Sequence, residues 1–141
     1  MQKNIRIAIV LASLLFAGLS VSAQQQSGSY DVFVPISKYI SQGNTDALSA
    51  WFADNLDITV LSKGGNSSKN QAKLLVDSFF NTHTPRSFEV TYTAGRGGMK
   101  YALGNLSAGG ETFLITIFVN CKPDSKSCSN RIQQFKIERV Q

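Results

Sequence analysis

The chain contains little of the chemistry that metal centres and most enzyme sites require. Its 141 residues include a single histidine, His83, and two cysteines, Cys121 and Cys128. A structural zinc site needs about four ligands, and His83 has no metal-motif spacing to either cysteine, so we predict no metal site. No paired acid and base can be identified from the sequence. We therefore predict no catalytic residue and no cofactor, and an enzymatic role stays open.

Clustered charge is also missing. Asp, Glu, Lys and Arg together make up 16% of the residues, the formal net charge is +5, and the basic residues are scattered along the chain. A nucleic-acid-binding surface needs a basic patch, so we predict no nucleic-acid partner. The glycine-rich motif GRGGMK, residues 95–100, lies between two strand-like runs instead of before a helix. It therefore indicates a hairpin turn and not a phosphate-binding loop.

The longest apolar run lies at the very start of the chain. Lys3 and Arg6 precede an apolar run at residues 7–19, which ends in the small-residue motif VSA at 21–23. This run is shorter than the ~20 residues that span a bilayer, and its order of basic, apolar and small residues is typical of a secretory signal peptide. We predict cleavage after Ala23, in preference to a retained signal anchor, and hence a periplasmic or secreted product with no transmembrane anchor.

Cleavage would leave 118 residues, a length that fits one domain with a real core. We expect residues 24–29 to form a flexible leader and residues 30–141 to form that single domain. Because the signal peptide removes Lys3 and Arg6, the formal net charge falls from +5 to +3. A mild charge of this kind indicates solubility and not a charged partner.

The two cysteines lie close together in the motif CKPDSKSC, residues 121–128. They could be a redox pair, half of a metal site or a covalent staple. A redox pair more often has the form CxxC beside a helix start, whereas here six residues separate the cysteines and strand-like runs flank them. An exported chain works in an oxidising compartment, so we predict a structural disulfide between Cys121 and Cys128. On the chain-entropy model, it would stabilise the fold by roughly 2.5 kcal/mol.

Hydrophobic periodicity predicts three helices in the N-terminal half. Residues 30–42 form the first, and Gly43-Asn44 ends it and caps a second short helix, whose apolar face would hold Leu48, Trp51 and Phe52. The glycine-rich segment 62–67 is predicted to be a loop. Ser68 and Gln71 then have the spacing of a capping box, which starts a third helix with the apolar stripe Ala72, Leu75, Val76, Phe79 and Phe80.

Period-2 alternation predicts strands in the rest of the chain. Residues 56–60 form one strand before the third helix. Four antiparallel strands follow it, at residues 88–93, 99–103, 111–119 and 131–140, and Gly104 indicates a bulge or a bend. Helices gathered before strands predict an α+β fold in which the helices cover one face of an antiparallel sheet.

Several segments carry a family resemblance. They are ISQGNTDALSAWFADNLDITV, SSKNQAKLLVDSFF, YALGNL and IQQFKIERV. Together they resemble the nuclear transport factor 2-like superfamily, and more narrowly a family of small exported Bacteroidetes-type proteins that form a domain of unknown function. The resemblance covers residues 30–140. It implies a strongly curved sheet wrapped around the long helix as a cone, a pocket at its open end and frequent dimerisation through the sheet.

Two functions are compatible with this resemblance. One is an exported non-catalytic module that binds a small apolar ligand in the cone, or a protein partner or second copy through the sheet. The other is a small cofactor-free isomerase or dehydratase with an acid or base in the cone. His83, in the segment NTHTPR, is the natural acid-base candidate, but we expect it to be solvent-exposed in a loop.

The aromatic residues supply the candidate pocket. Those predicted to point inward are Tyr39, Trp51, Phe52, Phe79, Phe80, Tyr92, Tyr101 and Phe113. Most of such a set is ordinary core. If the cone holds a ligand, we expect the residues with polar tips to orient it, which selects Tyr39, Trp51, Tyr92 and Tyr101 as candidate ligand-binding residues.

Overall fold

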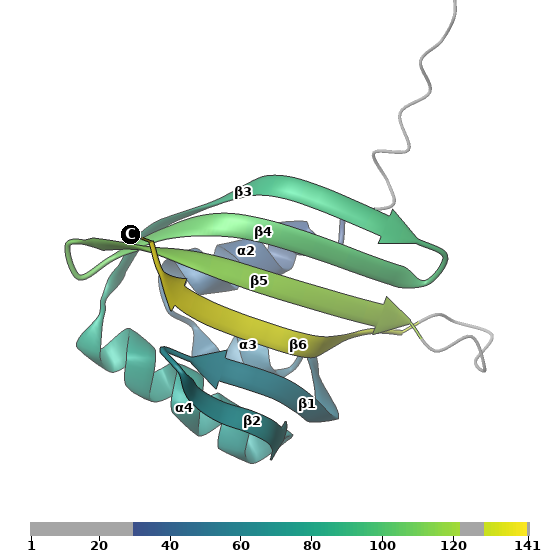
Figure 1. Cartoon of the computed structure of the whole chain (residues 1–141), viewed down its shortest axis with the longest axis horizontal. Coiled ribbons are helices and arrows are strands. Elements are labelled where there is room, and N and C mark those ends of the chain that lie inside the picture. Colours follow the sequence, from purple (N-terminus) through teal and green to yellow (C-terminus); the bar gives the residue numbers. More distant parts are fainter. Residues whose placement is uncertain (1–29, 122–128, 141) are drawn as a thin grey trace, which may run out of the picture.

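The described part of the chain folds into a six-stranded, strongly curved sheet with three helices on one face (Figure 1). The structure is a computed structural model that describes residues 30–121 and 129–140. The predicted signal peptide, the leader and Cys128 lie outside these residues. In the described part, no helix is both long and apolar enough to cross a membrane.

The elements follow one another as two helices, a β-hairpin, the long helix and four strands. They are α2 (Phe33–Gln42), α3 (Thr45–Ser49), β1 (Phe52–Val60), β2 (Lys63–Ser68), α4 (Lys69–Thr82), β3 (Pro85–Arg96), β4 (Met99–Ala108), β5 (Glu111–Cys121) and β6 (Asn130–Arg139). The strand order is β2-β1-β6-β5-β4-β3. Strand β1 pairs with β6 in parallel, and the other neighbours are antiparallel. The α+β class is confirmed.

The predicted helix signals are present at three helix ends. Gly43 ends α2 in the left-handed conformation, with φ of 63°, and the side chain of Asn44 accepts a hydrogen bond from the backbone N–H of Ala47 at the start of α3. In the capping box of α4, the Ser68 hydroxyl accepts from the Gln71 N–H and the Gln71 side chain accepts from the Ser68 N–H, both at 3.2 Å. These bonds satisfy backbone donors that the first helical turn leaves without partners.

Strand β2 occupies most of the segment that was predicted to be a loop, so that prediction is wrong. Residues 63–68 pair with β1 from Val60↔Lys63 to Asn55↔Ser68. Leu61 and Ser62 form the two-residue turn between these strands, and both have positive φ, 50° and 72°. An edge strand held by backbone bonds to one neighbour needs no alternating apolar pattern, which is why this polar segment gave no strand signal.

Helix α3 is shorter than predicted. It ends at Ser49, so Trp51 and Phe52 do not belong to it, and Phe52 begins β1 instead. The Trp51 carbonyl accepts a 2.7 Å hydrogen bond from the N–H of Ile132 in β6. Pairing with a strand about eighty residues away therefore overrides the local helical spacing of these two aromatic residues.

The hydrophobic core lies between the helices and the sheet. Helix α2 contacts β3, while α4 contacts β1 and β2. The largest fully buried side chains include Phe52, Phe113 and Phe135 from three neighbouring strands and Ile36 and Ile40 from α2. The opposite face of the sheet, which we call the outer face, carries no helix and faces the viewer in Figure 1.

A one-residue bulge in β3 decides which side chains reach the outer face. Val90 pairs with Gly104 and Tyr92 pairs with Leu103, so Thr91 is the extra residue. Gly104, where a bulge or bend was predicted, lies directly across the ladder. Because a one-residue slip turns every following side chain to the other face, Tyr92 points opposite to Val90.

The inward orientation predicted for Tyr92 and Tyr101 is therefore wrong. In β4 the fully buried positions are Ala102, Leu106 and Ala108, whereas Tyr101 alternates with them and pairs with Ala94. Tyr92 is 55% exposed. Both tyrosines thus belong to the outer face.

Candidate functional site

The four predicted ligand-binding residues lie in two separate pairs. Tyr39 on α2 and Trp51 before β1 are partly buried and pack against the core. Tyr92 and Tyr101 lie on the outer face, with ring centroids 6.4 Å apart in an edge-to-face arrangement. Because the sheet separates the two pairs, these four residues do not line one common pocket.

Aromatic rings pack against one another on the helix side of the sheet. The Phe79 ring on α4 meets the Phe113 ring on β5 edge-on at 5.0 Å, and the Phe52 and Phe135 rings lie 6.2 Å apart. Such pairs are typical of a packed core. These phenylalanines therefore have the core role that is usual for inward aromatic residues.

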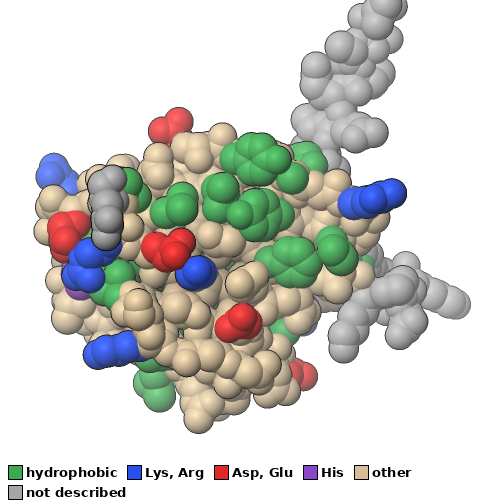
Figure 2. All heavy atoms as spheres, in the orientation of Figure 1, with side chains coloured by type: hydrophobic (Ala, Val, Ile, Leu, Met, Phe, Trp, Pro, Cys, Tyr) green, Lys and Arg blue, Asp and Glu red, His purple; other side chains and the backbone are tan. Residues whose placement is uncertain are grey.

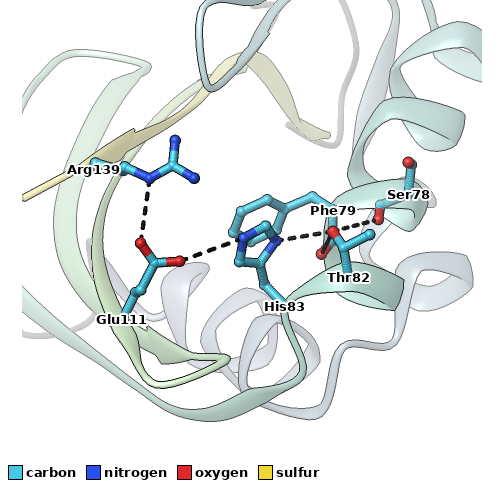
Figure 3. Close-up of polar contacts among 6 residues, drawn as sticks. All are labelled: Ser78, Phe79, Thr82, His83, Glu111 and Arg139. Atoms are coloured by element: carbon cyan, nitrogen blue, oxygen red, sulfur yellow. Dashed lines mark hydrogen bonds and ion pairs between the residues drawn. The ribbon is translucent and has the colours of Figure 1, made fainter.

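His83 is held by aromatic contacts and by polar groups near both nitrogens of its ring (Figure 3). The ring stacks on Phe79 with centroids 4.6 Å apart and meets the Phe113 ring edge-on at 5.3 Å. Its Nδ1 lies 2.9 Å from the Thr82 hydroxyl and its Nε2 lies 3.6 Å from a carboxylate oxygen of Glu111. The side chain is only 18% exposed. His83 does lie in the bend after α4, as predicted, but the prediction that its side chain is solvent-exposed is wrong.

The Thr82 hydroxyl shows how this histidine is oriented. Its oxygen lies 3.1 Å from the carbonyl oxygens of Ser78 and Phe79, to which its single proton is donated. The same hydroxyl lies within hydrogen-bond distance of Nδ1 of His83, and Nε2 on the other side of the ring faces Glu111. With both nitrogens engaged inside the chain, His83 connects structural elements and is poorly placed to shuttle protons for a substrate.

Glu111 extends this group of contacts to the last strand. One carboxylate oxygen faces His83 and the other accepts a 3.3 Å hydrogen bond from Nε of Arg139. The guanidinium carbon of Arg139 lies 5.9 Å from the centroid of the Phe113 ring. The end of α4, the start of β5 and the end of β6 are thereby linked. The two terminal nitrogens of Arg139 point away from Glu111 (Figure 3).

Apolar side chains gather on the outer face of β3, β4 and β5, beside the polar residues Asn105 and Thr116, and we call them the outer patch. Its members are neighbours across the strands, since Tyr92 pairs with Leu103, Ala94 with Tyr101, and Tyr101 with Phe118. Hydrophobic side chains gather over these three strands in Figure 2. The outer patch consists of Tyr92, Ala94, Tyr101, Leu103, Leu114 and Phe118.

The margin of the outer patch on β6 is polar and electrically balanced. Gln134 pairs with Phe118, and Lys136 and Glu138 continue the same face of β6. The Lys136 ammonium lies 3.0 Å from the Glu138 carboxylate. The rim on this side therefore presents both signs of charge.

A cleft of about 430 Å³ lies beside this margin, where β1 turns into β2, and we call it the end cleft. It is lined by Thr59, Leu61, Ser62, Lys136, Ile137, Glu138 and Arg139. None of these residues was singled out as a site residue from the sequence. The lining residues comprise two with hydroxyl groups, two cationic, one acidic and two aliphatic, so the cleft can recognise a polar molecule but contains no nucleophile with a base beside it.

Comparison with known proteins places the chain in a family. The model of the domain of unknown function DUF4783 matches residues 33–138. The chain belongs to the DUF4783 family. Comparison with curated proteins gave no match.

Solved structures agree with this assignment. A DUF4783 family protein from Bacteroides uniformis is 20% identical, with a TM-score of 0.68 over 76% of this chain and 95% of that chain. An NTF2-like protein of unknown function from Cytophaga hutchinsonii is 8% identical, with a TM-score of 0.56 over 79% of this chain and 89% of that chain.

A third neighbour carries a functional description. It is a putative dehydratase from the NTF2-like family of Streptomyces avermitilis, 9% identical, with a TM-score of 0.55 over 76% of this chain and 89% of that chain. At such identities these structures show the fold alone. The DUF4783 protein therefore has an NTF2-like fold, as its sequence predicted, and the fold does not choose its function.

Proposed function

We propose that this DUF4783 protein is an exported, non-catalytic binding module that pairs with a second copy of itself through the outer patch. The observation that carries the proposal is the contiguous set of apolar side chains on β3, β4 and β5, with the 55% exposed ring of Tyr92 against Tyr101. Contiguous apolar surfaces of this kind mark interaction sites, and aromatic residues are enriched at interface centres.

The chemistry of the outer patch and its margin favours a second copy as the partner. A two-fold interface brings the same surface together twice, so it must be complementary to itself. An apolar centre satisfies this requirement. The margin also holds Lys136 beside Glu138, so each copy presents both a positive and a negative group to the other copy. A partner with a strongly charged surface would need an excess of the opposite charge on this surface, and the outer patch and its margin have none.

Export is the second part of the proposal. It depends on the signal-peptide pattern of residues 1–23, with cleavage after Ala23, and it implies a periplasmic or secreted protein. A surface that pairs protein sheets needs no cofactor. The module would then act as a self-associating component of the cell envelope or the exported fraction.

The two other predicted functions have less support. A small apolar ligand in the cone would need Tyr39, Trp51, Tyr92 and Tyr101 to converge, and they lie on two sides of the sheet. An isomerase or dehydratase would need an acid or base free to reach substrate, and both nitrogens of His83 face groups of the chain itself. We therefore do not propose either function.

The test is the mass of the protein in solution after substitution of Tyr92. Light scattering at micromolar concentration should give twice the monomer mass for the unaltered protein and the monomer mass for Tyr92→Arg. Arginine at this position places like charges near one another across a two-fold interface. Both proteins should have the same far-ultraviolet circular dichroism, because Tyr92 is exposed in the single chain.

Leu74→Arg is the matched control. Leu74 is another large exposed apolar residue, 69% exposed, but it lies on α4 and not on the outer face. This variant should keep the dimer mass. An unaltered protein that is strictly monomeric would refute the proposal, and so would a Leu74→Arg variant that dissociates as readily as Tyr92→Arg.

A further inference from the structure

We propose that the strands of the two copies run in opposite directions across the interface of the dimer, so that Arg96 of each copy faces Glu89 of the other. This inference rests on the proposed dimer through the outer patch, and it adds the direction of the two-fold axis. The supporting observation is the position of these two charges on the outer face, one on either side of the apolar centre.

Strand β3 presents one acidic and one basic side chain on the outer face. Glu89 pairs with Asn105 and Arg96 pairs with Met99, and both of these β4 residues are offset by an odd number of positions from the buried residues of that strand. In a regular strand, residues seven positions apart point to opposite faces. The extra residue at Thr91 reverses this, so Glu89 and Arg96 share the outer face, and both are exposed.

Neither of these two charges is neutralised inside its own copy. Within residues 30–121 and 129–140, Glu89 and Arg96 have no ion pair and no side-chain hydrogen bond. A charge of this kind can meet an opposite charge on a second copy without first losing an internal contact. Charges at the rim of an interface determine how the partners are oriented more than how tightly they bind.

Strand β6 repeats the arrangement on the other side of the outer patch. Arg131 pairs with Asn120 and Glu138 pairs with Leu114, again seven positions apart and again with one extra residue, Gln133, between them. Arg131 is exposed and donates one 2.8 Å hydrogen bond to a backbone carbonyl, which leaves its charge in place. Glu138 already has a lysine beside it, so it contributes less than Glu89 does.

The ladders align these charges into a basic end and an acidic end of the outer face. The basic row across the strands is Arg96, Met99, Asn120 and Arg131, and the acidic row is Glu89, Asn105, Leu114 and Glu138. Most of the outer patch occupies the two rows between them, namely Ala94, Tyr101 and Phe118 in one and Tyr92 and Leu103 in the other. The middle of the outer patch is therefore also midway between the two charged rows.

The direction of the two-fold axis decides which ends meet. An axis in the interface that runs across the strands, midway between the charged rows, places each strand over its own copy in the opposite direction. Arg96 then faces Glu89 of the second copy, and by symmetry this contact occurs twice. An axis along the strands would bring the two basic ends together and the two acidic ends together, which is electrostatically unfavourable.

Edge-to-edge pairing of β3 with its copy is the other arrangement that could join these charges. Strand β3 is at the edge of the sheet, but the bulge at Thr91 interrupts its regular backbone, and bulges protect edge strands from such pairing. It would also leave the outer patch uncovered. Face-to-face packing covers the outer patch and joins the charges at the same time.

Sedimentation equilibrium measures the dissociation constant of the dimer for the unaltered protein, Arg96→Glu, Glu89→Arg and the double variant. Each single inversion should raise this constant by about tenfold at low salt, because two attractive contacts become repulsive. The double variant should return close to the unaltered value, and an equimolar mixture of the two single variants should associate equally well. At ~1 M salt, where the Debye length is about 3 Å, the differences should largely disappear.

Lys38→Glu is the matched control. It makes the same change of charge at an exposed residue of α2, on the helix side of the sheet, and should leave the dissociation constant unchanged. A dimer that Tyr92→Arg dissociates but that neither single inversion weakens would overturn the orientation and keep the outer patch as the interface. A double variant as weak as the single variants would overturn the Arg96–Glu89 contact. A strictly monomeric unaltered protein would overturn both the orientation and the dimer.

Discussion

Replacement of Gly104 by alanine should destabilise the protein, although glycine inside a strand is normally a weak point. Glycine costs roughly 0.5–1 kcal/mol relative to alanine in a strand, so an open site would gain stability from this change. Gly104 is not an open site. A Cβ atom there would overlap the ring of Phe88 and lie 2.8 Å from the carbonyl oxygen of Glu89.

The size of the loss follows from these two contacts. The Phe88 ring can rotate away in part, but the Glu89 carbonyl belongs to the paired backbone of β3 and cannot move without disturbing the bulge at Thr91. Overpacking of this kind costs about 1–3 kcal/mol, which exceeds the gain from the lost glycine. We expect a net loss of about 1–2 kcal/mol, which corresponds to roughly 4–8 °C in Tm for a domain of this size.

Urea unfolding of four proteins measures the effect and its cause. They are the unaltered protein, Gly104→Ala, Phe88→Ala and the double variant, which together form a mutant cycle. If the ring is the main obstacle, Gly104→Ala should cost less in the Phe88→Ala background, and any remaining cost reports the Glu89 carbonyl. A Gly104→Ala variant that is more stable than the unaltered protein would refute the reasoning.

Two further predictions concern the helix cap and the cysteine loop. Ser68→Ala should lower the free energy of unfolding by about 1 kcal/mol because the Gln71 N–H loses its acceptor, whereas Ser78→Ala on the exposed side of the same helix should be close to neutral in the same urea titration. Cys121→Ser should lower Tm and leave the circular dichroism spectrum unchanged if Cys121 and Cys128 are paired, and thiols that titrate freely in the native protein would contradict the pairing.

The sequence predicted those elements whose signals are local. The Ser68–Gln71 capping box, the glycine at the end of α2 and the Asn44 cap each depend on residues within a few positions of one another. Local hydrogen-bond geometry determines these features, so the amino-acid pattern is sufficient to find them. The long apolar run of β5 was recognisable for a related reason, because every second residue is buried on the core face and the residues between them include Leu114 and Phe118 of the outer patch.

The features that were missed depend on long-range pairing. Trp51 and Phe52 fit a helical face, yet both interact with β6 through the backbone. Phe52 pairs with Ile132, and the Trp51 carbonyl accepts a hydrogen bond from the Ile132 N–H. Tyr92 continues the alternation of Phe88 and Val90 in sequence, but the bulge at Thr91 reverses its direction. One inserted residue changes the face of every side chain after it and leaves no compositional trace.

The candidate sites were harder to predict than the fold for the same reason. The outer patch combines residues of three strands, and its membership changes with the position of a single bulge. The end cleft joins the turn after β1 to the end of β6, which are more than seventy residues apart in the chain. The positive φ of Leu61 and Ser62 had no signal in the sequence, since neither residue is typical of such a turn.

The position of β6 between β1 and β5 has a consequence for how the protein is made. Strand β6, residues 130–139, joins the β1–β2 hairpin to the β3–β4–β5 meander, and β1 meets it in parallel. Every residue up to 139 must therefore be synthesised before the sheet can close. Until then the facing edges of β1 and β5 are both open, and open edges are the sites at which unfinished chains pair with one another. The last of the described strands is thus the one that joins the two parts of the sheet and covers both open edges.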